Sequence, residues 1–146
     1  MPRTESTVII KRPVQDVFAF VENPANDRLW RNGMVEAEIT SEGPIGIGTT
    51  GREAYRLLGR RSETTWEITE YVPNGRVAYR STSGPVKYRG EFTYEAVDEG
   101  TRVTFVLEWE QVDRGFYRGL TDRLLKLISA GTNEGELANL KRLLDS

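Results

Sequence analysis

The feature that most constrains the fold is a long amphipathic segment at the C-terminal end of the chain. The run from Asp113 to Ser146 is the only long helical pattern in a sequence otherwise composed of short alternating strands. A helix must bury its apolar stripe, and only strands offer enough apolar surface to cover it. We therefore expect an antiparallel sheet that curls around this helix. Asp113 predicts the N-cap, and Val112 with Tyr117 occupies the positions of a hydrophobic staple.

The terminal segment carries two apolar stripes that differ in helical phase. The aliphatic residues are Leu120, Leu124, Leu127 and Ile128 in the first half, and Leu137, Leu140 and Leu144 in the second. Gly131, followed by Asn133 and Glu136 at capping-box spacing, predicts a kink or break between the halves. The second half would then anchor the helix. The first half, from Phe116 to Ile128, would line and gate a pocket.

Two short helices are predicted directly after the first strand. Pro13 is favoured at a first helical position, and the residues that follow it form one apolar face at helical spacing. That face comprises Val14, Val17, Phe18 and Val21. The Asn23-Pro24 step ends this helix and caps a second short helix that runs through Leu29.

Period-two alternation of apolar and polar residues predicts seven strands. They are expected at Ser6–Ile10, from Met34 onward, and at Thr49–Leu57, Arg60–Tyr71, Arg76–Thr82, Val86–Ala96 and Thr101–Gln111. Short turns join the last six, which should form an antiparallel meander. Pro73-Asn74-Gly75 predicts a tight hairpin because Asn and Gly tolerate positive φ. Gly90 interrupts an apolar row, which indicates a bend or the close approach of another group.

The glycine-rich stretch between two of these strands does not predict a nucleotide site. The residues from Gly43 to Gly48 read GPIGIG, without the spacing of a dinucleotide motif, the lysine of a P-loop or a following helix. A turn between strands explains the pattern.

Composition excludes several kinds of chemistry. The chain contains no cysteine and no histidine, which removes disulfides, thiol nucleophiles and the commonest base and metal ligand. A net charge of -2, with basic residues scattered among acids, gives no general attraction to nucleic acid. No apolar run is long enough to span a bilayer, and no signal segment is evident. We expect one domain over residues 1–146, cytoplasmic, with no metal, cofactor, nucleic acid or membrane insertion.

Several different short motifs lie along nearly the whole chain in a characteristic order. They are I-x-x-P-V-x-x-V-F-x-F-V at Ile10 to Val21, Pro24, Trp30, Gly43-Pro44, Gly46-x-Gly48-Thr49, Gly59-Arg60, W-E-I-T-E-Y-x-P at Trp66 to Pro73, and the run Gly100 to Thr104. In this order and spacing they resemble the START/Bet v 1-like (SRPBCC) superfamily. More narrowly, the chain is similar to its polyketide cyclase/dehydrase and lipid-transport families.

The resemblance implies an α+β helix-grip fold. This is a seven-stranded curved antiparallel sheet wrapped around a long C-terminal helix, with two short helices after the first strand. It also implies a cavity between sheet and helix that binds a hydrophobic or amphipathic small molecule of lipid or polyketide type. A minority of the superfamily catalyse cyclisation or dehydration, and fold likeness alone does not choose between these activities.

The candidate ligand-binding residues lie on the apolar face of the meander and at the start of the terminal helix. They are Trp66, Tyr79, Tyr88, Phe92, Phe105, Trp109, Phe116, Leu120 and Leu124. Tyrosine and tryptophan combine an apolar body with a polar tip, which suits a mostly apolar pocket with a few orienting groups. The alternative for each residue is ordinary core packing against the helix.

The candidates for acid–base chemistry are few because histidine and cysteine are absent. Glu53 and Tyr55 share one face of their strand, and Arg52 and Arg56 share the other. A carboxyl group on the inward face would have a pKa raised by desolvation and would serve as an acid or base. Because buried charge is rare, we expect these side chains to be solvated near the sheet edge. No nucleophile with its base, and no metal-ligand cluster, is evident.

Three functions remain open on the sequence alone. The first is binding of a hydrophobic or amphipathic small molecule. The second is catalysis of the cyclase/dehydrase type, which requires a desolvated acid or base such as Glu53 inside the pocket. The third is a co-chaperone-like interaction module, which predicts a filled core and an exposed apolar patch. The sequence determines neither the ligand nor the oligomeric state.

Overall fold

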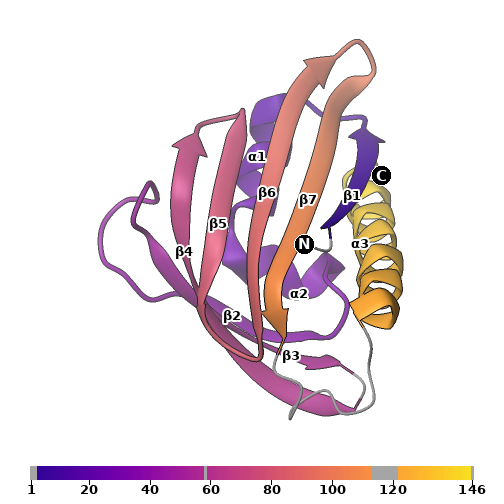
Figure 1. Cartoon of the computed structure of the whole chain (residues 1–146). Helices are drawn as coiled ribbons and strands as arrows, with labels where there is room; N and C mark the ends of the chain where they lie inside the picture. The colour runs from indigo at the N-terminus through magenta and orange to yellow at the C-terminus, as the bar shows by residue number, and fades with distance from the viewer. Residues whose placement is uncertain (1–2, 58, 113–121, 146) are drawn as a thin grey trace.

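Seven strands form one antiparallel sheet, and the helices pack on one side of it (Figure 1). The computed structural model describes residues 3–57, 59–112 and 122–145, except for the side chains of 57, 60, 111, 112 and 122–133. The strands are β1 (Arg3–Ile10), β2 (Met34–Ile39), β3 (Thr50–Leu57), β4 (Arg60–Val72), β5 (Arg76–Ser83), β6 (Val86–Val97) and β7 (Gly100–Val112). The helices are α1 (Val14–Val21), the single turn η1 (Pro24–Asn26), α2 (Asp27–Trp30) and α3 (Asp122–Asp145).

The sheet order is β1-β7-β6-β5-β4-β3-β2, which confirms the predicted meander of the last six strands. The first strand joins the far side of this meander by pairing with β7, where Ile10 lies opposite Thr101. The predicted hairpin between β4 and β5 is also confirmed. Asn74 there has a φ of 62°, a left-handed conformation that asparagine tolerates.

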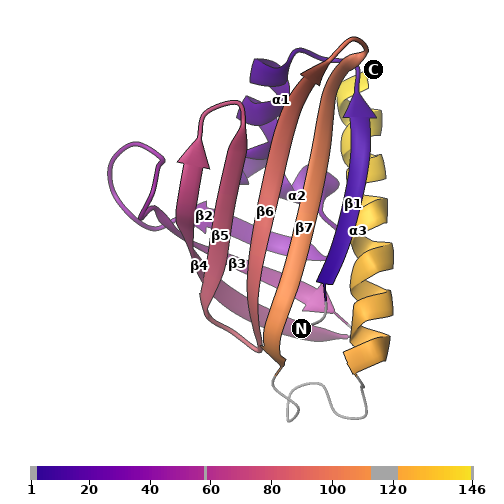
Figure 2. The same ribbon diagram turned by 45° about the horizontal axis from the view of Figure 1, so that its top comes forward.

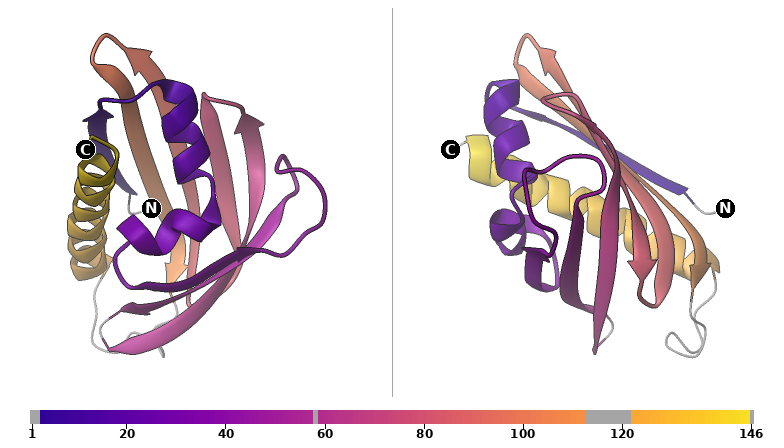
Figure 3. Two further views of the ribbon diagram at one scale, coloured as in Figure 1. Left: turned by 180° about the vertical axis from the view of Figure 1, so that it is seen from behind. Right: turned by 90° about the vertical axis from the view of Figure 1, so that its left-hand side faces the viewer.

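The sheet is curved, and all three α-helices lie on the same side of it (Figures 2 and 3). Seen from behind, α1 and α2 lie in front of the central strands, and α3 runs beside β1 (Figure 3). This is the predicted helix-grip arrangement. It leaves the inner face of the central strands covered by α1 and α2, and the candidate site lies there.

The short helix α1 forms where the apolar stripe predicted it. Val17, Phe18 and Val21 are buried against the sheet. Leu137 and Leu140 of α3 enter the same core, so the second half of the terminal helix is anchored as expected.

Of the kink or break predicted near Gly131, the break is wrong, because α3 is one continuous helix across this residue. The kink stays a prediction. A glycine inside a helix costs about 1 kcal/mol relative to alanine, which tertiary contacts readily offset. Such contacts fasten the second half to β1 and the residue that follows it. Lys141 donates from Nζ to the carbonyl oxygen of Ile9 at 2.6 Å, and Asp145 accepts from the backbone N–H of Lys11 at 2.7 Å. The predicted start at Asp113 lies outside the described residues.

Candidate functional site

A pocket lies between the inner face of the sheet and the segment from α1 to α2. Its volume is about 60 Å³. The apolar wall is formed by Trp30, Ile45, Trp66, Ile68, Val77 and Phe92. The polar side chains that reach it are Glu22, Asp27, Arg31, Glu53 and Tyr79. The pocket is therefore an apolar chamber with a small number of convergent polar groups, which is the composition of a small-molecule site.

Two glycines make room for the aromatic wall. A Cβ atom at Gly51 would lie 2.0 Å from the ring of Trp66, and one at Gly90 would lie 2.9 Å from the ring of Tyr79. The close approach predicted at Gly90 is thus confirmed, and Tyr79 is the approaching group. The ring centroids of Trp66 and Tyr79 are 6.3 Å apart, and those of Tyr79 and Phe92 are 6.2 Å apart. The absence of a side chain at Gly51 and Gly90 thus leaves room for a continuous aromatic surface.

Glu22 reaches the pocket from the C-terminal end of α1. Its carboxylate accepts a hydrogen bond from the hydroxyl of Tyr94 on β6. Burial raises the pKa of Glu22 from 4.5 to about 7, although the bond from Tyr94 and the charge of Arg31 oppose the shift. Near neutral pH this carboxyl group therefore exists in both protonation states.

Asp27 and Arg31 are one helical turn apart, with Asp27 at the start of α2 and Arg31 capping its end. The backbone N–H of Arg31 donates to the carbonyl oxygen of Asp27 at 2.8 Å. Burial raises the pKa of Asp27 to about 7, opposed by the charge of Arg31 and aided by the charges of Glu53, Glu22 and Glu136. The charges of the neighbouring acids therefore help to set the pKa of Asp27.

Arg31 is held by a partner from α3. Its Nε lies 3.6 Å from Oε2 of Glu136, whose side chain is 6% exposed. The same oxygen accepts from the backbone N–H of Asn32 at 2.8 Å. The guanidinium also lies 5.3 Å from the ring centroid of Trp30 and 5.8 Å from that of Phe105, within range of cation–π attraction. The cation is thus positioned and partly neutralised from within the protein.

Glu53 is buried, so the expectation of a solvated carboxylate is wrong for this residue. Although β3 lies near the edge of the sheet, its inner face is covered. Oε1 of Glu53 accepts from the hydroxyl of Tyr88 at 3.2 Å, and burial raises the pKa of Glu53 against the effects of Arg31 and Tyr88. Tyr55, on the same face, is half-buried with its pKa also raised by burial.

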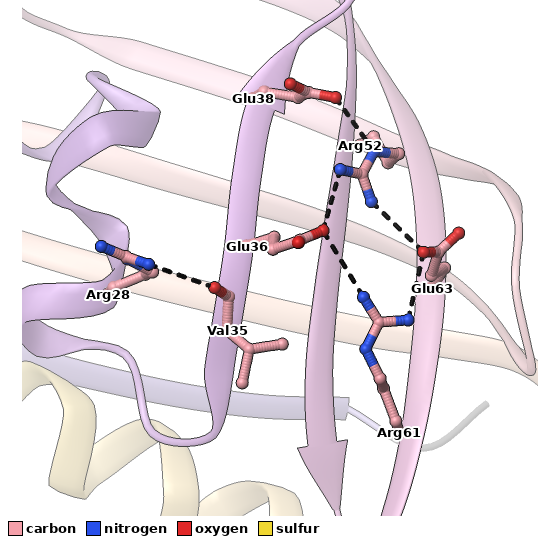
Figure 4. A network of polar contacts seen from close by, with 7 residues as sticks. All are labelled: Arg28, Val35, Glu36, Glu38, Arg52, Arg61 and Glu63. Carbon is pink, nitrogen blue, oxygen red and sulfur yellow. Dashed lines mark hydrogen bonds and ion pairs between the residues drawn. The ribbon is translucent and has the colours of Figure 1, made fainter.

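The outer face of the same strands carries an exposed ion-pair network (Figure 4). Arg52 contacts three carboxylates on β2 and β4, at 2.9 Å to Glu36, 3.0 Å to Glu38 and 3.3 Å to Glu63. Arg61 adds contacts to Glu36 at 3.4 Å and to Glu63 at 3.2 Å. For Arg52 the expectation of a solvated side chain agrees with this position.

Two buried donors on residues that line the pocket have no hydrogen-bond partner within the described part of the chain. One is Nε of Arg31, whose contact with Glu136 at 3.6 Å is an ion pair, and the other is the indole N–H of Trp30. Trp30 is 3% exposed, and within the described part of the chain nothing accepts a hydrogen bond from its indole N–H. A buried N–H of this kind normally finds an acceptor, so this donor is available to an acceptor atom that reaches it.

The candidate ligand-binding residues divide into three groups. Trp66, Tyr79 and Phe92 line the pocket. Tyr88, Phe105 and Trp109 do not line the pocket: Tyr88 donates to Glu53, the ring centroid of Phe105 stacks 4.4 Å from that of Phe92, and Trp109 is buried. Phe116, Leu120 and the side chain of Leu124 lie outside the described residues. Ligand binding by any of them stays a prediction.

Sequence reasoning missed Glu22, Asp27 and Arg31, the polar residues of the short helices. One signal for Glu22 was present, because it follows Phe18 by four positions and so continues the apolar stripe of α1. Glu136 shows the same signal four positions before Leu140. An acid in line with a buried stripe indicates an interior carboxylate.

The volume of the pocket limits what it can hold. Pockets for drug-sized molecules usually measure about 300–1,000 Å³. At about 60 Å³ the described pocket has room for a few waters or for the polar end of a larger molecule. It is smaller than the ligand-sized cavity that we expected. The side chains in the first half of α3, which we expected to line that cavity, lie outside the described residues.

The described part of the chain offers neither a metal cluster nor a membrane-spanning helix. Among the described side chains, no group of three or more acids is arranged to hold a metal ion. Within residues 3–57, 59–112 and 122–145, no helix is long and apolar enough to cross a membrane. The absence of a cofactor and the cytoplasmic localisation stay predictions.

The fold and pocket define a helix-grip protein, and solved structures share this architecture. TTHA0849 from Thermus thermophilus is 20% identical with a TM-score of 0.80, covering 98% of this chain and 97% of that one. The Zhui aromatase/cyclase from Streptomyces sp. R1128 is 16% identical with a TM-score of 0.78, covering 98% and 93%. A START superfamily protein from Mycobacterium smegmatis is 13% identical with a TM-score of 0.80, covering 98% and 97%. At these identities the likeness shows the fold alone.

A family model assigns the chain more narrowly. The model described as "Polyketide cyclase / dehydrase and lipid transport" matches residues 1–145. The chain therefore belongs to this family, within the START/Bet v 1-like (SRPBCC) superfamily, as the motifs predicted. No curated protein sequence matches it.

Proposed function

We propose that this protein binds an amphipathic small molecule in the pocket between the sheet and the short helices. The observation that carries the proposal is the pocket itself, in which an aromatic surface faces a few convergent polar groups. Burial of apolar ligand surface supplies about 25 cal/mol per Å² before the costs of ordering. The polar groups, chiefly Arg31, Glu53 and Tyr79, set the orientation of the ligand.

Because the pocket is small, we infer that the polar end of the ligand lies inside it and that the apolar part lies elsewhere. Only the polar end fits within about 60 Å³. Ile45, which lines the pocket and is 37% exposed, marks its opening to solvent. The apolar part of the ligand therefore extends past Ile45 or widens the space beside the aromatic wall. The family description and the fold shared with an aromatase/cyclase and a START protein support binding of this kind.

Two isoleucines on the loop between β2 and β3 give a matched test. Ile45 lines the pocket, whereas Ile47 is 74% exposed and does not line it. With a decyl-chain alcohol as probe, Ile45→Trp should weaken calorimetric binding about tenfold or more by obstructing the opening. Ile47→Trp should leave the affinity unchanged. Equal affinities in both variants and the parent would contradict the proposal.

Native mass spectrometry of the protein purified from its own cells supplies an independent readout. A co-purifying small molecule, lost in Ile45→Trp and retained in Ile47→Trp, supports the proposal. A discrete protein partner without any small molecule would favour an interaction module instead.

A cyclase or dehydrase activity is the second candidate, and the buried acids favour it. Glu53 has the desolvated environment that raises a carboxyl pKa, and Glu22 has a pKa of about 7, suited to proton transfer near neutral pH. Conversion of a polyketide-like substrate that survives Trp66→Ala and is lost in Glu53→Gln would establish catalysis. Binding without conversion in the parent protein would leave the chain a carrier.

A further inference from the structure

Among the described side chains, the charges around the pocket are unbalanced, and this imbalance narrows the class of ligand. Three described carboxyl groups line the pocket, on Glu22, Asp27 and Glu53, against one described cation, Arg31. The described titratable groups that act on them come from every surrounding element. These are Glu22 directly after α1, Asp27 in α2 and Arg31 directly after it, Glu53 and Tyr55 on β3, Tyr71 on β4, Tyr79 on β5, Tyr88 and Tyr94 on β6, and Glu136 on α3.

Arg31 alone cannot balance the charge of the three lining acids, because it also pairs with a fourth acid. Glu136 lies 3.6 Å from its Nε, and the rings of Trp30 and Phe105 flank its guanidinium. The remaining support for the lining acids is neutral. Tyr94 donates to Glu22, and Tyr88 donates to Glu53. The pocket therefore has an excess of acid that the described side chains do not match with positive charge.

The unpartnered indole N–H of Trp30 points independently to a ligand. It belongs to a side chain that is 3% exposed and that lines the same pocket. An N–H donor needs an oxygen acceptor, which an amine in its protonated form cannot supply. A ligand that matches this site therefore carries a positive charge and, close to it, an oxygen that accepts a hydrogen bond.

Resting on the proposed function, we propose that the polar end of the ligand is an amino alcohol. Its protonated amine lies among the carboxyl groups of Glu22, Asp27 and Glu53, and its hydroxyl oxygen accepts from Trp30. Such a group has a few non-hydrogen atoms, in keeping with a volume of about 60 Å³. The aromatic wall adds cation–π attraction to the amine and apolar contact to the chain that follows.

The same charges disfavour an acidic ligand. A fatty acid carboxylate would join three lining acids and Glu136, with Arg31 as their shared cation. An amine instead replaces the protons that burial holds on Glu22 and Asp27, both of which have a pKa of about 7. Binding of the amine at pH 7 should therefore release protons to the buffer.

The test compares four probes with one chain length: N-decylethanolamine, decylamine, decanol and decanoic acid. In calorimetric titrations at pH 7, the amino alcohol should bind most tightly and the acid about tenfold or more weakly. The enthalpy for the two amines should vary with the ionisation enthalpy of the buffer, as proton release requires. Trp30→Phe should remove the advantage of the amino alcohol over decylamine.

Charge variants give the second arm. Asp27→Asn and Glu53→Gln should each reduce the preference for amine over alcohol, whereas the exposed control Glu99→Gln should not. If the acid and the alcohol bind as tightly as the amines, the inference is overturned and small-molecule binding stands. If no probe binds, the proposed function and the inference both fail. The ranking by the parent protein decides the matter even where a variant does not fold.

Discussion

Two groups of charged side chains lie on opposite faces of the same strands and differ in nearly every property. The outer group, defined by Glu36, Glu38, Arg52, Arg61 and Glu63, is exposed and closely paired. The inner group, defined by Glu22, Asp27, Arg31, Glu53 and Glu136, is enclosed and short of positive charge. Arg52 and Glu53 are consecutive in β3, yet one belongs to each group.

The comparison shows that solvent exposure decides whether the pKa of a carboxyl group is lowered or raised. In the outer group, hydrogen bonding and charge from Arg52 lower the pKa of Glu36. In the inner group, desolvation exceeds the attraction of Arg31 and raises the pKa of Glu22, Asp27 and Glu53. Solvated pairs of the first kind contribute little to stability. With a pKa of about 7, Glu22 and Asp27 are partly protonated at neutral pH.

The largest expected difference between the groups follows from removing the arginine of each. Arg31→Met leaves Glu136 and the pocket acids without their buried cation, which should cost about 3–5 kcal/mol of unfolding free energy at pH 7. The deficit should shrink in acid, because protonation removes the uncompensated charges. Arg52→Met, on the exposed face, should change stability much less. Denaturant unfolding measures both, and equal losses would remove the distinction between the groups.

Space on the inner face gives the next largest effect. Gly51→Ala places a methyl group where the ring of Trp66 lies, and should cost about 1–3 kcal/mol because the pocket wall must shift. Gly46→Ala is the matched control, since its Cβ meets nothing within 4 Å. Thermal unfolding together with tryptophan fluorescence would report the loss. An unperturbed Gly51→Ala variant would show that Trp66 is not packed there.

The pH dependence of stability should follow the raised pKa of Glu22. The folded state holds this proton more tightly than the unfolded state, so the contribution is present below about pH 4.5 and is lost as the pH rises through 7. Glu22→Gln should remove roughly 1–3 kcal/mol of this decline. Unfolding free energies at several pH values test the slope. Part of the slope should remain, because the pKa of Asp27 is also raised to about 7. A slope that the substitution leaves unchanged would contradict the assignment to Glu22.

Glu36 should show the smallest effect and the opposite sign. Its pKa is lowered in the folded state, so its contribution is present above pH 4.5 and is lost as the pH falls. Glu36→Gln should therefore flatten the pH dependence only in the acid range, and added salt should weaken the effect. A change confined to neutral pH would contradict the assignment.

The sheet, the short helices and the family were predictable because they depend on local periodicity and on turn residues. The alternation in β6 and β7, and the stripe of Val17, Phe18 and Val21 in α1, each predict one buried face. The burial of the inner group was harder to predict from the sequence. Glu53 alternates correctly with Tyr55, but the sequence does not show that α2 brings Arg31 over this face of β3. A buried charge depends on contacts between distant segments, which periodicity does not encode.

The continuity of α3 was mispredicted for a related reason. Local signals at Gly131 and Asn133 favour a new helix start, whereas contacts of Lys141 and Asp145 with the chain around the end of β1 hold the second half in one continuous helix. Local propensity is a weak guide wherever tertiary contacts outweigh about 1 kcal/mol.

A carboxyl-carbon NMR titration of the intact protein tests the central claim most directly, namely that Glu22 and Asp27 of the inner group are desolvated and are partly protonated near neutral pH. Glu22 and Asp27 should titrate with midpoints near 7, while Glu36 should titrate below 4.5. Assignment by Glu22→Gln, Asp27→Asn and Glu36→Gln identifies each resonance. Midpoints for Glu22 and Asp27 in the same acid range as Glu36 would contradict the account.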